Sequence, residues 1–277
     1  MMDGTAFPLQ TNADLVDIIT DIRGQASHED IMAKLMGKCS MPVPSQRLQN
    51  AVDLALRLLI MMDVGVFDNV YTGRRNVTWT TGTLADFLKR LGLFNACPVI
   101  PCLGVKLESS FHVCNVERIA GLKVQLTTNL HDHLLLREDI RTVFVFHHAA
   151  FLQSHIRSSV FPDGFIEETL ETLALLFPKG NRQVQKWYKK KDCEEELDFA
   201  VLTISPPPRR VDKYNYWRDR LVTLKEAFDD SQPHSFGQWW HDRRDATQWY
   251  AVWIAVFFTV FFGLVQSVVG IMQLYKT

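Results

Sequence analysis

The chain has 277 residues, and its 30 lysines and arginines nearly balance its 31 aspartates and glutamates, which gives a formal net charge of -1. A strong nucleic-acid-binding surface is not expected, because such surfaces are markedly basic. The 5 cysteines are an odd number at irregular spacing, which argues against a disulfide framework and indicates reduced thiols in a cytosolic setting.

Residues 1–95 predict a helical, winged-helix-like module. Apolar residues recur at helical spacing in three segments, at residues 13–23, 27–36 and 45–62. Two short strands and a further short helix are expected after them, at residues 64–68, 76–80 and 83–91. This order is typical of domains that bind DNA through the third helix. The charges do not favour DNA binding, because Asp53 and Asp63 balance Arg47 and Arg57. A protein-docking or structural role is favoured.

Residues 96–204 predict an α+β region. Residues 105–113 and 122–127 have strand-like patterns, and a helical turn at residues 115–119 separates them. Residues 142–146 are an apolar run that suits either a strand or a helix, and both alternatives stay open. A helix is expected over residues 165–177, which carry apolar residues at helical spacing and precede a proline.

Residues 205–235 predict a linker and an amphipathic helix. The linker is expected to be extended, because Ser205 is followed by consecutive prolines. The helix is expected over residues 214–229, with its apolar side chains on one face: Trp217, Leu221, Leu224 and Phe228.

Residues 236–277 predict a juxtamembrane segment and a transmembrane helix. No charged side chain occurs from Ala246 to Tyr275, and about 20 apolar residues suffice to cross a hydrocarbon core of roughly 30 Å. Aromatic residues, which favour the headgroup level, lie at both edges of this span, at Trp239, Trp240, Trp249, Tyr250, Trp253 and Tyr275. The expected fold class is therefore mainly α with small β elements, an α+β soluble region with a winged-helix-like N-terminal part, plus one C-terminal transmembrane helix.

The flanking charges predict how this span is oriented. Arg243 and Arg244 precede it and only Lys276 follows it, and the acidic first 30 residues contain no run that resembles a signal peptide. We expect a single-pass, tail-anchored protein in the lipid bilayer, with its N-terminal region in the cytosol. The endoplasmic reticulum and the mitochondrial outer membrane both remain open as destinations.

Small and polar residues share one face of the predicted span: Thr259, Gly263, Gln266, Ser267, Gly270 and Gln273. Small residues at this spacing let a second helix approach closely, and the two glutamines could form hydrogen bonds across such a contact. The face therefore predicts a homo-oligomer formed through the tail helix. The alternative is that glycine and serine are simply common in membrane helices.

Three groups of side chains are candidates for chemistry or ligand binding. The first is a set of histidines at His131, His133, His147, His148 and His155, and the second is a zinc ligand set at Cys97, Cys102, His112 and Cys114. The third is the basic, aromatic segment 186–191, favoured as a solvated loop because acidic residues follow it. None predicts a catalytic residue or a cofactor, and metal binding stays an open question.

Several segments resemble a large fungal family of uncharacterised proteins that end in one membrane span. They are residues 146–152, 166–178, 216–221, 238–244 and 262–266. The resemblance covers most of residues 10–277 and implies the single-span topology. It implies no specific activity.

The sequence therefore favours a membrane-anchored cytosolic module that has an interaction or structural role and binds an unidentified protein partner. An enzyme is less favoured. The alternative function is a metal-dependent enzyme with its site around His131 to His155.

Overall fold

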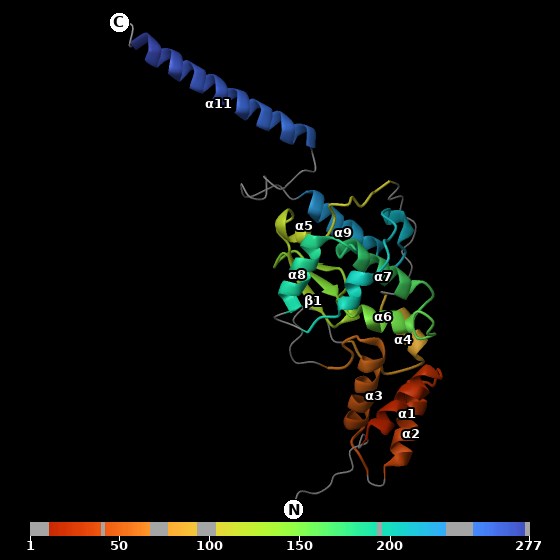
Figure 1. Cartoon of the computed structure of the whole chain (residues 1–277). Coiled ribbons are helices and arrows are strands. Elements are labelled where there is room, and N and C mark those ends of the chain that lie inside the picture. Colours follow the sequence, from red (N-terminus) through yellow and green to blue (C-terminus); the bar gives the residue numbers. More distant parts are fainter. Residues whose placement is uncertain are drawn as a thin grey trace, which may run out of the picture. The chain divides into compact units, whose positions relative to one another are not determined.

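The computed structural model describes residues 11–39, 42–66, 77–92, 104–192, 196–230 and 246–274 (Figure 1). The chain divides into two compact units, Met1–Asp230 and Ser231–Thr277. The described residues are mainly helical with a small sheet, which confirms that part of the predicted fold class. The predicted domain limits at residues 95, 204 and 235 stay predictions.

The first three helices of the chain pack together. They are α1 (Asn12–Arg23), α2 (His28–Lys38) and α3 (Ser45–Ile60), close to the predicted segments. α1 begins at a capping box, in which the side chain of Thr11 accepts the backbone N–H of Asp14. Ile18 and Ile22 of α1 are fully buried, and α1 packs mainly against α3. Local signals and one apolar stripe thus suffice to define this part of the fold.

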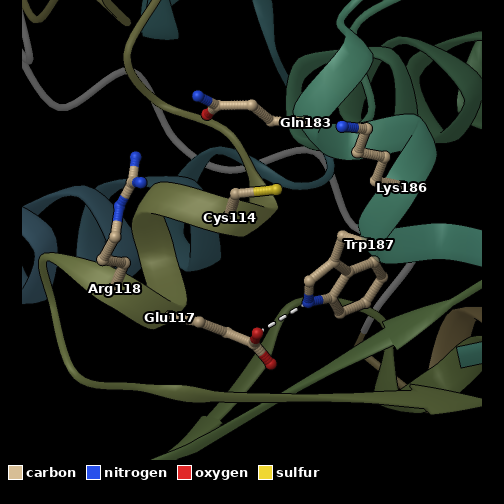
Figure 2. A pocket seen from close by; sticks show the side chains of 6 residues that line it. All are labelled: Cys114, Glu117, Arg118, Gln183, Lys186 and Trp187. Carbon is tan, nitrogen blue, oxygen red and sulfur yellow. Dashed lines mark hydrogen bonds between the residues drawn. The ribbon is translucent and has the colours of Figure 1, made fainter. Parts of the chain in front are cut away.

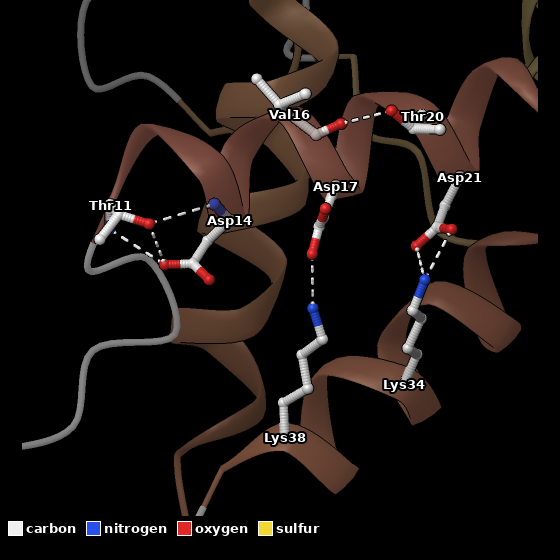
Figure 3. A network of polar contacts seen from close by, with 8 residues as sticks. All are labelled: Thr11, Asp14, Val16, Asp17, Thr20, Asp21, Lys34 and Lys38. Carbon is white, nitrogen blue, oxygen red and sulfur yellow. Dashed lines mark hydrogen bonds and ion pairs between the residues drawn. The ribbon is translucent and has the colours of Figure 1, made fainter.

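Two ion pairs join α1 to α2 (Figure 3). Asp21 lies 2.6 Å from the Nζ atom of Lys34, and Asp17 lies 2.8 Å from that of Lys38. Both lysines are about half exposed, so water and salt screen these contacts, and each pair contributes at most about 1 kcal/mol. The pairs set the register of the two helices more than they stabilise them.

The region predicted to form the wing begins after α3. The backbone N–H of Gly65 donates to the carbonyl oxygen of Val77 over 2.8 Å, so the two predicted strand segments do meet there. The described parts of those segments, 64–66 and 77–80, are nevertheless not strands. Gly65 has a φ of 110°, and a Cβ atom there would lie 2.9 Å from the buried carboxylate of Asp53. The position thus requires glycine. The short helix α4 (Leu84–Arg90) follows, as predicted.

Three strands of the described chain form the sheet, which has the order β1-β3-β2. They are β1 (Lys123–Thr127), β2 (Leu135–Arg137) and β3 (Thr142–Phe146). β3 is parallel to β1 and antiparallel to β2, and all five of its residues are buried. Residues 142–146 are therefore a strand, and the prediction of a strand at 122–127 is confirmed.

Asn129 connects the sheet to the N-terminal helices. Its side-chain amide donates to the carboxylate of Asp63 over 3.1 Å and to that of Asp132 over 2.9 Å. The backbone N–H of the next residue, Leu130, donates to the carbonyl oxygen of Met61. Because Asn129 is buried, these hydrogen bonds are shielded from water and fix the end of α3 beside the end of β1.

Five further helices surround the sheet. They are α5 (Val113–Arg118), α6 (Ala149–His155), α7 (Phe165–Leu176), α8 (Arg182–Asp192) and α9 (Arg218–Asp229). α7 buries 10 of its 12 residues and is the central helix of this region. The described residues also contain three short 3-10 helices, η1 (Leu130–Asp132), η2 (Phe199–Thr203) and η3 (Val211–Lys213).

The predicted linker at 205–210 is extended but paired. Lys106 and Arg210 form an antiparallel bridge, and the backbone N–H of Leu107 donates to the carbonyl oxygen of Arg209. The guanidinium of Arg209 also donates to the carbonyl oxygen of Glu108 over 2.7 Å. The prediction of a strand over 105–113 was wrong apart from this bridge, because no longer partner strand lies beside it in the described structure.

Glu168 of α7 holds the start of α9. Its buried carboxylate accepts three backbone N–H groups, from Asn215, Tyr216 and Trp217, over 2.7 to 2.8 Å. The indole N–H of Trp217 then donates to the hydroxyl of Thr169. Burial raises the pKa of the Glu168 carboxyl, and the three N–H donors oppose that rise by stabilising its charged form. The carboxylate thus fixes the segment that leads into α9 from another helix.

The second unit contains α11 (Ala246–Leu274). None of the helices in the described part of the chain combines the length and the apolar character needed to cross a bilayer. The predicted transmembrane helix, and with it the single-pass, tail-anchored topology, was therefore wrong.

Replacing Glu168 with glutamine should destabilise the first unit. A glutamine oxygen can still accept two N–H groups, but its NH2 group would face the third donor, the N–H of Asn215. We expect Glu168→Gln to lower the free energy of unfolding by about 1–3 kcal/mol, measured from urea midpoints by circular dichroism.

Glu171→Gln is the matched control on the same helix. The carboxylate of Glu171 is only half-buried, so this change should cost less than about 0.5 kcal/mol. Equal stability of the two variants would show that the hydrogen bonds from Glu168 to residues 215–217 contribute little to stability.

Candidate binding surfaces

An open depression lies between α5 and α8 (Figure 2). Its volume is about 450 Å³, and six side chains line it: Cys114, Glu117, Arg118, Gln183, Lys186 and Trp187. Three come from each helix, so the depression exists because the two helices pack against each other. It offers two cations, an amide, an indole and a thiol to a ligand.

Glu117 fixes the indole of Trp187. One carboxylate oxygen of Glu117 accepts the indole N–H over 2.6 Å, and the other accepts the backbone N–H of Val124 over 3.2 Å (Figure 2). Trp187 also packs beside the buried ring of Phe177, with 5.9 Å between ring centroids. The indole therefore forms a preorganised wall of the depression.

Basic residues of α5 and α8 lie in and beside the depression. α8 carries five basic residues within three turns: Arg182, Lys186, Lys189, Lys190 and Lys191. Arg118 adds a guanidinium from α5, whose Nη2 atom donates to the side chain of Asn115 while its Nε atom is shielded and lacks an acceptor. The prediction that residues 186–191 form a loop was wrong, because Val184, Trp187 and Tyr188 supply an inner face and make the segment a helix.

The thiol of Cys114 is not an activated nucleophile. Burial raises the pKa of this thiol, so it is protonated at neutral pH, and no histidine lines the depression to remove its proton. The geometry of the depression suits binding rather than covalent chemistry. Of the other residues in the predicted zinc set, Cys97 and Cys102 lie outside the described residues.

His133 belongs to the core. Its Nδ1 atom accepts the backbone N–H of Phe146, which leaves the proton on Nε2, and this nitrogen contacts the hydroxyl of Thr172 over 2.8 Å. The imidazole also meets the indole of Trp217 edge to face, with 4.7 Å between centroids. Burial lowers the pKa of His133 to about 3. Because both nitrogens already have partners, this histidine has a structural role.

The other histidines of the predicted set do not converge on one point. His147 and His148 lie side by side at the end of β3, with 4.0 Å between ring centroids, whereas His155 packs on Phe151 at the end of α6. The carbonyl oxygens of His131 and His133 accept hydrogen bonds from the guanidinium of Arg220. Nowhere among the described residues do three histidine, cysteine, aspartate or glutamate side chains gather in a way that would hold a metal ion.

α11 carries the predicted association face. Thr259, Gly263, Gln266 and Ser267 lie on its described surface, whereas the side chains of Gly270 and Gln273 lie outside the described residues. The hydroxyls of Thr259 and Ser267 donate to carbonyl oxygens four residues earlier in the same helix. The face is therefore small and has its hydroxyl groups satisfied.

Little of the predicted aromatic belt falls within the described residues. Tyr250 is exposed and Trp253 is half-buried. The side chains of the other four members lie outside the described residues, at Trp239, Trp240, Trp249 and Tyr275.

Buried histidines should make the protein less stable as the pH falls. Burial lowers the pKa of His147 to about 4, from about 6.5 in the unfolded chain. Between these values the unfolded chain binds the extra proton, so acidification favours unfolding by up to about 1.4 kcal/mol per pH unit for this group. Between pH 7 and pH 5, the free energy of unfolding should therefore fall by about 2 kcal/mol less in His147→Phe than in the unmodified chain. Urea unfolding at both pH values measures this difference.

The comparison between the two proteins isolates His147, because all other titrating groups are shared. An identical loss in both would refute the assignment of this pH dependence to His147.

Comparisons of the chain with protein families, with curated proteins and with solved structures gave no match. The resemblance to fungal single-span proteins therefore remains a prediction from the sequence.

Proposed function

We propose that this chain is a non-enzymatic protein-interaction module that associates with a second copy of itself through α11. The observation that carries the proposal is the exposed apolar surface of α11. Four phenylalanines on this helix are at least half exposed: Phe257, Phe258, Phe261 and Phe262. A helix that is apolar on all sides is normally buried, because each aromatic side chain gains about 1.5–3 kcal/mol on leaving water.

The small face of α11 is where a second helix fits best. A Cβ atom at Gly263 would meet nothing within 4 Å, so the single chain leaves this space open. The hydroxyls of Thr259 and Ser267 donate to their own helix, so close contact would leave neither hydroxyl without an acceptor. The phenylalanines, by contrast, stack along the helix in pairs, with Phe257 on Phe261 and Phe258 on Phe262. Small residues at a contact let two backbones approach closely.

The interior of the first unit supports a binding role as well. His133 has both ring nitrogens in hydrogen bonds, and the Cys114 thiol is held in its protonated form. His133 thus serves packing, and the protonated thiol of Cys114 is not an activated nucleophile.

Filling the small face should weaken self-association. We expect Gly263→Leu to raise the dissociation constant of the full chain at least tenfold, measured by sedimentation equilibrium. Because a Cβ atom at this position meets nothing within 4 Å in the single chain, a loss of self-association reports a contact between chains.

Val265→Leu is the matched control, since it adds a leucine about 200° around the helix from Gly263. It should change the dissociation constant less than twofold. Equal behaviour of both variants, or a monomeric wild-type chain that is recovered with phospholipid vesicles, would contradict the proposal.

A further inference from the structure

We propose that the depression between α5 and α8 binds an acidic segment of a protein partner. In this assignment a carboxylate of the partner lies between Arg118 and Lys186, and a neighbouring apolar side chain lies against the indole of Trp187. This site is separate from α11 and does not depend on self-association.

The first argument is the charge left for a ligand. The only carboxylate in the lining belongs to Glu117, and both of its oxygens already accept hydrogen bonds from the indole of Trp187 and the backbone of Val124. Among the described residues, the ion pairs involve neither Arg118 nor Lys186 and lie on other elements. A carboxylate is therefore the complementary group for the two cations of this depression.

The second argument is the fixed geometry of the wall. The hydrogen bond between Glu117 and Trp187 joins α5 to α8, so the indole keeps its orientation in the free protein. Figure 2 shows Arg118 and Lys186 on opposite sides of the depression, with Cys114 between them. A preorganised site loses little entropy on binding, which favours even a small ligand segment.

The third argument concerns the kind of partner. The five cations of α8 occupy one short helix, and the chain as a whole has a net charge of -1, so the described residues offer only a short basic surface to a nucleic-acid backbone. A short peptide needs only one or two carboxylates and an apolar anchor. The small volume of about 450 Å³ suits a few side chains of such a segment.

The test uses the full chain and a fluorescein-labelled peptide that alternates glutamate with phenylalanine, followed by fluorescence anisotropy. We expect saturable binding that weakens as salt concentration rises, because the contacts are charged. Lys186→Glu should raise the dissociation constant at least tenfold. Arg118→Gln should raise it as well, since it removes the second cation.

Lys89→Glu is the matched control. Lys89 is exposed on α4 and does not line the depression, so this charge reversal should change binding less than twofold. A peptide with glutamine in place of every glutamate should not bind. The Gly263→Leu chain should bind the acidic peptide as the wild type does, which separates this site from the proposed role of α11.

Three results would overturn the proposal. One is equal binding by Lys186→Glu and Lys89→Glu. The second is binding of the glutamine peptide as tight as that of the acidic one. The third is tighter binding of single-stranded DNA, or of phosphatidylserine vesicles, with the same sensitivity to Lys186→Glu.

Discussion

The first unit depends on one buried carboxylate. Glu168 lies in the most buried helix, and its charge is tolerated there because three backbone donors at the start of α9 surround it. The same contact places Trp217 against His133, and it brings Arg220 to the carbonyl groups after β1. A single anion in α7 therefore determines how a segment nearly 50 residues later covers the sheet.

Local patterns predicted the helices that have caps and an apolar stripe. They failed where contacts with residues distant in the sequence determine the secondary structure. Thr142 to Phe146 could not be assigned from sequence, because a fully buried run has no period, and only its pairing with β1 makes it a strand. α8 was missed because its many cations concealed the inner residues Val184 and Tyr188. The depression beside it could not be foreseen, since its residues 114–118 and 183–187 meet only through packing.

The two proposed contacts depend on different interactions, one apolar and one between charges. α11 offers apolar side chains without charge, so its association should persist or strengthen at high salt concentration. The depression between α5 and α8 offers Arg118 and Lys186, so binding there should weaken under the same conditions. One chain could thus remain assembled while its acidic partner is released.

The strand order carries a consequence for synthesis on the ribosome. β3 is the last strand to be made, yet it occupies the middle of the sheet. β2 and β3 are close in sequence and can pair as an antiparallel hairpin as soon as both have been made, whereas β1 has no partner strand until β3 is present. The edge of β1 that β3 will cover therefore stays unpaired in the nascent chain until Phe146 has emerged.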